Sequence, residues 1–99
     1  MKTKWRAGTY LKVLSVDKGD RFYVCNDAIA EQGGIFVKTV TPPQRLLNGT
    51  YWFTGKLLKN YPDIKTQLHS DGLFAGEEAK FDYANIKKLT VAERRRLRR

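Results

Sequence analysis

The residues whose types most clearly suggest a binding function lie near the carboxyl end of the chain. Residues 87–99 hold seven basic side chains against one acidic side chain, a net charge of +6 out of the +9 of the whole sequence. Guanidinium groups match phosphate oxygens with two parallel hydrogen bonds, and counterion release favours binding to a polyanion at low salt. We therefore expect this segment to bind phosphates. Its basic residues are Lys87, Lys88, Arg94, Arg95, Arg96, Arg98 and Arg99.

A run of aromatic residues provides the second candidate binding feature. Tyr51-Trp52-Phe53 fall on a predicted strand, where neighbouring side chains point to opposite faces. If the first and third rings enter the core, Trp52 points outward; the reverse assignment exposes two rings. An exposed ring beside positive charge can stack an unpaired base, as in OB-like barrels, and the alternative is that a loop or the carboxyl-terminal helix covers it. The basic residues close to this run in the sequence are Arg45, Lys56 and Lys59.

Residue types that support catalysis are scarce. His69 and Cys25 are the only histidine and cysteine in the sequence, which argues against a histidine-based metal cluster and excludes an intrachain disulfide. Cys25 lies in an apolar segment, where a buried, inert thiol is favoured over a nucleophile paired with His69. Gly33-Gly34 lacks the spacing and the lysine of a phosphate-binding loop. We expect a protein that is not an enzyme and that uses no cofactor and no metal.

Length and composition limit the architecture. The 99 residues suit one domain, and a hydrophobic fraction of 41% is too high for a disordered chain. We find no run approaching the roughly 20 apolar residues of a membrane-spanning helix, and the basic start of the chain is not followed by the apolar segment of a secretory signal. These features favour a cytoplasmic protein with no membrane partner.

The body of the chain reads as short strands separated by turns. Residues 9–16 and 21–26 predict a hairpin about a turn at 17–20, and residues 35–41 predict a strand that ends at Pro42-Pro43. Residues 44–47 and 50–54 predict a second hairpin, with Asn48-Gly49 in a type I′ turn. Residues 76–83 alternate as a half-buried strand, and residues 84–89 then predict a tight turn. Residues 60–72 fit one or two helical turns or a loop. The aromatic residues assigned to the core are Tyr10, Phe22, Phe36, Phe74 and Phe81.

Residues 90–99 predict a short helix. Thr90 can cap its first turn, with Glu93 at the spacing of a capping box, and Val91 and Leu97 are the side chains available to dock it. The whole pattern predicts a mainly β fold: a small SH3-like or OB-like barrel of five to six short antiparallel strands with a short carboxyl-terminal α-helix. The expected division is a barrel domain over residues 1–89 and a basic helix or tail over residues 90–99. The ending of strand, tight turn and helix resembles SH3-like barrels.

The basic helix is also similar to the short arginine-rich helices that insert into RNA hairpins, including those of phage antiterminators. This resemblance implies RNA as the partner. Taken with the aromatic run, it favours a non-enzymatic nucleic-acid-binding module, with RNA or single strands preferred because stacking needs unpaired bases. The alternative is a small basic protein-interaction module, an inhibitor or adaptor of phage or plasmid origin, that docks on an acidic protein surface. Charge alone does not separate the two.

Overall fold

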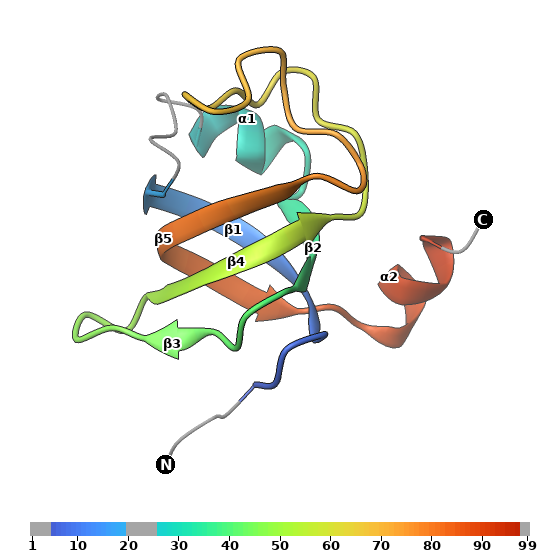
Figure 1. Cartoon of the computed structure of the whole chain (residues 1–99). Coiled ribbons are helices and arrows are strands. Elements are labelled where there is room, and N and C mark those ends of the chain that lie inside the picture. Colours follow the sequence, from blue (N-terminus) through green and yellow to red (C-terminus); the bar gives the residue numbers. More distant parts are fainter. Residues whose placement is uncertain (1–4, 20–25, 98–99) are drawn as a thin grey trace.

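A computed structural model describes residues 5–19 and 26–97 of the chain. Within these residues the chain forms five strands and two short helices (Figure 1). In chain order the elements are β1 (Tyr10–Lys18), α1 (Asn26–Glu31), β2 (Ile35–Thr39), β3 (Gln44–Arg45), β4 (Tyr51–Leu57), β5 (Glu78–Lys88) and α2 (Val91–Arg96).

Four of the strands close into a small antiparallel barrel. The sheet runs β2-β1-β5-β4-β3, and an additional pairing of β2 with β4 closes the first four of these strands into a ring. Every one of these pairings is antiparallel, and β3 extends the sheet beyond the closed part as the partner of β4. The structure thus confirms the predicted mainly β fold with a small SH3- or OB-like barrel and a short carboxyl-terminal helix.

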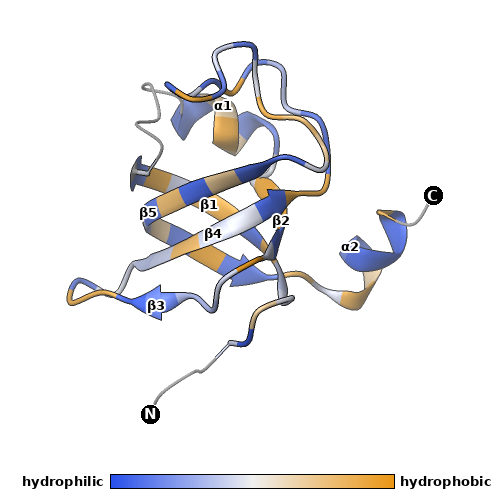
Figure 2. Cartoon of the chain, viewed as in Figure 1, coloured by the Kyte–Doolittle hydropathy of each residue, from blue (hydrophilic) through white to orange (hydrophobic). Residues whose placement is uncertain are grey.

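The core follows from the alternation of side chains along the strands (Figure 2). On β4, Phe53 and Leu57 are buried and the residues between them face outward or contribute little side chain. Phe53 stacks on Phe81 of β5, with ring centroids 5.3 Å apart. Gly55 lies between these layers, where a Cβ would come within 3.1 Å of Phe53 and Val37. A glycine at this position therefore lets β4 pack closely inside the barrel.

Strand β5 is longer than the sequence pattern suggests. It pairs with β4 through Glu78–Ala84 and with β1 through Asp82–Lys88, so it belongs to both halves of the barrel. Tyr83 has a positive φ of 52°, and at this irregularity the buried position passes from Phe81 to Ala84. The predicted tight turn over residues 84–89 is therefore wrong. The bend lets one strand turn a corner without leaving the sheet, as bulges do in small barrels.

Helix α1 was not anticipated by the sequence pattern. Asn26 accepts a hydrogen bond at its Oδ1 from the backbone N–H of Val16, at 2.9 Å, and Ile29 is fully buried. The helix ends at two glycines with positive φ, and the N–H of Gly34 donates to the carbonyl of Ile29, as in a Schellman motif. Of the predicted strand over 21–26, residues 21–25 lie outside the described residues, and Asn26 begins α1. The two strands found beside β1 are β2 and β5.

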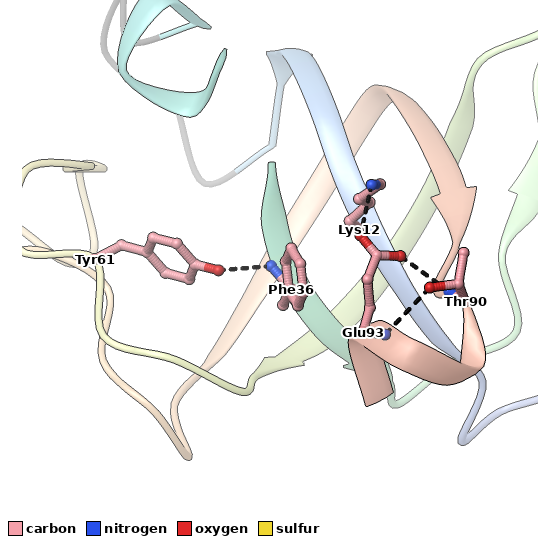
Figure 3. Close-up of polar contacts among 5 residues, drawn as sticks. All are labelled: Lys12, Phe36, Tyr61, Thr90 and Glu93. Atoms are coloured by element: carbon pink, nitrogen blue, oxygen red, sulfur yellow. Dashed lines mark hydrogen bonds and ion pairs between the residues drawn. The ribbon is translucent and has the colours of Figure 1, made fainter. Parts of the chain in front are cut away.

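The open question over residues 60–72 is resolved in favour of a loop. Tyr61 and Leu73 form an isolated bridge, and Ile64 and Thr66 between them are fully buried. This loop lies with α1 at one end of the barrel (Figure 1). The Tyr61 hydroxyl accepts a hydrogen bond from the backbone N–H of Phe36 at 2.8 Å (Figure 3). Desolvation by burial raises the pKa of the Tyr61 hydroxyl, and this hydrogen bond partly offsets the rise.

The β3–β4 hairpin is confirmed, but its turn is not type I′. Gly49 has a φ of 87°, whereas Asn48 is not among the described residues with positive φ. The N–H of Gly49 donates to the carbonyl of Leu46, and the N–H of Leu46 donates to the carbonyl of Thr50. The Asn48 side chain instead accepts from the backbone N–H of Thr50 at 3.1 Å. This is a three-residue loop with glycine in the left-handed position.

Candidate nucleic-acid interface

Helix α2 is docked by polar contacts rather than by burial. Thr90 caps the helix and forms the predicted capping box with Glu93. The Glu93 carboxylate also accepts a hydrogen bond from the Lys12 ammonium at 2.8 Å, which ties α2 to β1 (Figure 3). No residue of α2 is buried, and Val91 is 65% exposed, so the expectation that Val91 docks the helix is wrong. Leu97 is half-buried, beside Leu58.

The ion pair between Lys12 and Glu93 affects the pKa of the glutamate. Hydrogen bonds from Lys12 and from the backbone N–H of Thr90 lower the pKa of Glu93 from its ordinary 4.5 to about 2. The carboxylate is thus charged throughout the neutral range and neutralises Lys12. It sits near the positive end of the α2 dipole, which favours the same charged form. Glu93 therefore fixes α2 in place and leaves the arginines of the helix as its unbalanced charge.

Tyr10 lies at the junction between α2 and the barrel. The Arg94 guanidinium carbon stands 4.5 Å from the centroid of the Tyr10 ring, and the Lys38 ammonium stands 5.4 Å from it. Both separations fall within the range of a cation–π contact. The prediction that places Tyr10 in the core is wrong, because its ring is only partly buried and serves as the platform for Arg94. Arg94 thus contacts the barrel through the Tyr10 ring.

The strand register connects this junction to the middle of the sheet. Tyr10 on β1 is the partner of Lys38 on β2, and Lys38 is the partner of Lys56 on β4. Directly opposed residues of antiparallel strands have neighbouring side chains on one face. Glu78, the β5 partner of Lys56, borders this row. Three strands thus carry one continuous row of side chains that begins beneath Arg94.

A second row runs beside the first. Lys87 on β5 is the partner of Lys12, and Lys12 is the partner of Phe36 on β2. The Lys59 ammonium stands 5.0 Å from the centroid of the half-buried Phe36 ring. Together the two rows and α2 form a surface that we call the basic band. Its members are Lys38, Lys56, Lys59 and Lys87 along the rows, the exposed Arg94, Arg95 and Arg96 of α2, and Lys88, which lines a hollow with Tyr10 and Arg94.

Trp52 stands at the far end of this band. On β4 the buried residues are Phe53 and those two and four positions further on, so Trp52 and Lys56 share the outward face. Trp52 is 38% exposed, which agrees with the predicted assignment of an outward ring. Tyr51 points the other way and stacks on Trp5, with ring centroids 5.3 Å apart. Trp52 is therefore the most exposed ring of this run, Tyr51 being half-buried and Phe53 buried.

Arg45 does not join Trp52. Arg45 is the register partner of Tyr51, whereas Trp52 is opposed by Gln44, so the arginine lies on the opposite face of the hairpin. Its guanidinium reaches toward Gly49 in the turn. The expectation that Arg45 flanks the stacking ring is therefore wrong, because one residue of register separates the two faces.

The structure brings together most of the other predicted residues, although in an arrangement that the sequence did not specify. Lys56 and Lys59 lie on the face of Trp52 and Phe36, Lys87 is the partner of Lys12, and Lys88 lines a hollow with Arg94 of α2. Arg98 and Arg99 are outside the described residues. Sequence reasoning missed Tyr10 and Lys38, although the alternation in Tyr10–Leu14 and Ile35–Thr39 offers a signal for both. Phe74, which was assigned to the core, is 37% exposed, and Phe36 is half-buried.

The part of the chain that the structure describes has few features that suggest a metal site or a catalytic site. Among residues 5–19 and 26–97, no three or more histidine, cysteine, aspartate or glutamate side chains gather as metal ligands would. The Nε2 atom of His69 is 3.1 Å from the carbonyl oxygen of Glu78. Cys25 falls outside the described residues. No helix in this part of the chain is long and apolar enough to cross a membrane.

Comparisons of the chain with models of protein families, with curated proteins and with solved structures found no match.

Proposed function

We propose that the protein is a non-enzymatic nucleic-acid-binding module that prefers RNA or single-stranded DNA. The observation that carries this proposal is the continuity of the basic band. Arg94, Tyr10, Lys38 and Lys56 are successive neighbours, and Lys56 shares its strand face with the exposed Trp52. Positive charge and a partly open ring therefore lie on one surface, which is the combination that single-strand-binding barrels use.

The dimensions of this surface suit a short stretch of a polynucleotide. Tyr10 and Lys56 are separated by two strand spacings, and Trp52 lies four residues further along β4. At about 4.8 Å per strand spacing and 3.3 Å per residue, the straight line from Tyr10 to Trp52 across the sheet spans roughly 16 Å. OB-fold sites accommodate about 4–16 nucleotides. The band is thus long enough for several consecutive phosphates, with one base stacked on Trp52.

The distribution of acidic residues favours the same face. Among the described residues, most exposed carboxylates lie on α1 and on the loop that precedes β5, at one end of the barrel (Figure 1), while Glu78 lies on β5 opposite Lys56. Those on α1 and the loop are Asp27, Glu31, Asp63, Asp71 and Glu77. They repel a polyanion from that end, while the basic band attracts it, and such asymmetry orients an approaching strand. We further propose that the protein binds nucleic acid in the cytoplasm.

The proposal is tested by titrating the full chain with labelled single-stranded RNA, single-stranded DNA and duplex DNA of equal length at several salt concentrations. We expect saturable binding that is tighter for the single strands. The variant Arg95→Gln/Arg96→Gln/Arg98→Gln/Arg99→Gln removes four charges, which lowers the slope of log K against log salt by up to about 2.8 for a single strand. An unchanged slope would exclude these arginines as the phosphate-binding element.

A negative result has a definite meaning. If the chain binds none of the three nucleic acids at low salt, and a pull-down of a protein partner survives nuclease treatment, the basic band serves an acidic protein surface instead. The nucleic-acid proposal is then wrong. Lys65→Gln is the matched control, because Lys65 is exposed on the loop before β5 and lies outside the basic band.

A further inference from the structure

Two hollows flank the stacked side chains of Arg94 and Tyr10. The first has a volume of about 230 Å³ and is lined by Gly8, Thr9, Tyr10, Lys88, Leu89 and Arg94. The second has a volume of about 150 Å³ and is lined by Tyr10, Leu58, Arg94 and Leu97. Because Tyr10 and Arg94 belong to both linings, the two hollows adjoin on the two sides of the Arg94–Tyr10 stack, between α2 and the barrel, and we refer to them together as the groove.

The halves differ in chemistry. Lys88 and Arg94 are the charged residues of the first half, and none of its six lining residues is acidic. Glu93, the nearest carboxylate in the chain, is turned toward Lys12 and Thr90 instead. The second half is bounded by the apolar side chains of Leu58 and Leu97 and by the planar groups of Tyr10 and Arg94. One half thus suits an anion, and the other suits a flat, largely apolar group.

A single unpaired nucleotide likewise has an anionic part, its phosphate, and a flat, largely apolar part, its base. We propose that the groove binds one nucleotide of a single strand, with its phosphate between Lys88 and Arg94 and its base against Leu58 and Leu97. This inference rests on the proposed function and adds a base-binding subsite at α2 to the one at Trp52. A guanidinium plane can stack on a base while its N–H groups face a phosphate, so Arg94 contacts both parts of the nucleotide.

The occupant follows from the pairing of the two halves. A lone carboxylate side chain would fill the basic half alone, whereas a nucleotide brings a phosphate for one half and a planar base for the other. A base-paired nucleotide in a duplex does not present its base as a separate flat group, because its faces are covered by its neighbours. The groove of the protein therefore favours single strands over duplex. In addition, the contacts of Glu93 hold α2 against the barrel, so the helix is not free to enter the groove of a duplex.

The test compares two oligonucleotides of equal length and charge, one of thymidines and one composed of abasic sites. With the full chain, we expect the thymidine strand to bind more tightly than the abasic strand by at least about fivefold. Leu97→Ala and Leu58→Ala each reduce this ratio and leave the salt slope unchanged, because no charge is lost. Arg94→Lys, which keeps the charge but removes the planar group, also reduces the ratio.

The control is Leu47→Ala, since Leu47 at the tip of the β3–β4 hairpin is fully exposed and outside the groove. It leaves the ratio unchanged. If the wild-type chain binds both strands and none of the three groove variants alters the ratio, the nucleotide subsite is refuted while the nucleic-acid function stands. If the wild-type chain binds neither strand, both proposals fail. Circular dichroism verifies the folding of each variant, and Arg94→Lys tests the groove through an exposed side chain.

Discussion

Removing the two lysines at the centre of the basic band provides the sharpest test of its role. Lys38 and Lys56 are register partners on β2 and β4, and both side chains are exposed. The double variant Lys38→Gln/Lys56→Gln removes two positive charges without changing the core. Each phosphate contact on a single strand contributes about 0.7 to the slope of log K against log salt. We therefore expect the slope to fall in magnitude by about 1.4.

The same arithmetic gives the loss of affinity at fixed salt. Two contacts worth 0.7 each correspond to a factor of about 25 in K at 0.1 M monovalent salt. Fluorescence anisotropy of a labelled 20-nucleotide strand, measured at several salt concentrations, yields the slope and the affinity together. Lys65→Gln serves as the single-charge control and leaves the slope nearly unchanged. An unaltered slope in the double variant, or an equal change for Lys65→Gln, would refute the reasoning that the band contacts phosphates.

Three further predictions concern single side chains. Trp52→Ala weakens single-strand binding by about 1–3 kcal/mol with no change in salt slope, and Trp52→Phe restores most of the loss; equal binding by wild type and Trp52→Ala would rule out stacking there. Because the pKa of Glu93 is lowered to about 2, its ion pair with Lys12 is fully formed above about pH 4.5 and is lost as the pH falls through about 2. NMR signals of Tyr10 should therefore report the undocking of α2 near pH 2. A midpoint near pH 4.5 would contradict the lowered pKa of Glu93. Tyr61→Phe leaves the buried N–H of Phe36 without its acceptor and lowers the free energy of unfolding by about 1–3 kcal/mol in denaturant titrations, whereas an unchanged midpoint would mean that this N–H finds another partner.

The parts of the fold that the sequence predicts are those set by local chemistry. Pro42-Pro43, which cannot donate to a ladder, fall in the gap between β2 and β3, although β2 already ends at Thr39 and not at Thr41 as predicted. Asn48-Gly49 produce a hairpin even though the turn differs in type. Thr90 and Glu93 sit at capping-box spacing, and the box is present. In each case a side chain acts on backbone groups a few residues away, so no knowledge of the rest of the chain is required.

The parts that the sequence does not predict depend on distant partners. Residues 84–88 have few local signals for a strand, yet they continue β5 because β1 supplies partners 68 to 77 positions away in the chain. Arg94 and Tyr10 are likewise far apart in the chain and meet only when β5 carries α2 to the start of β1. The candidate site was therefore predictable in its residue types but not in its arrangement, which tertiary pairing decides.

Because β5 pairs with both β1 and β4 and comes late in the chain, its synthesis controls when the barrel can close. Until residues 78–88 have been synthesised, β1 lacks a neighbour along most of its length and β4 lacks one on its β5 side, so two strand edges stand open on the nascent chain. Because the last pairing joins the two most distant strands, closure is a late and comparatively slow event. Mutations that weaken β5 should thus lower the yield of usable protein through aggregation during synthesis, even where the finished barrel tolerates them.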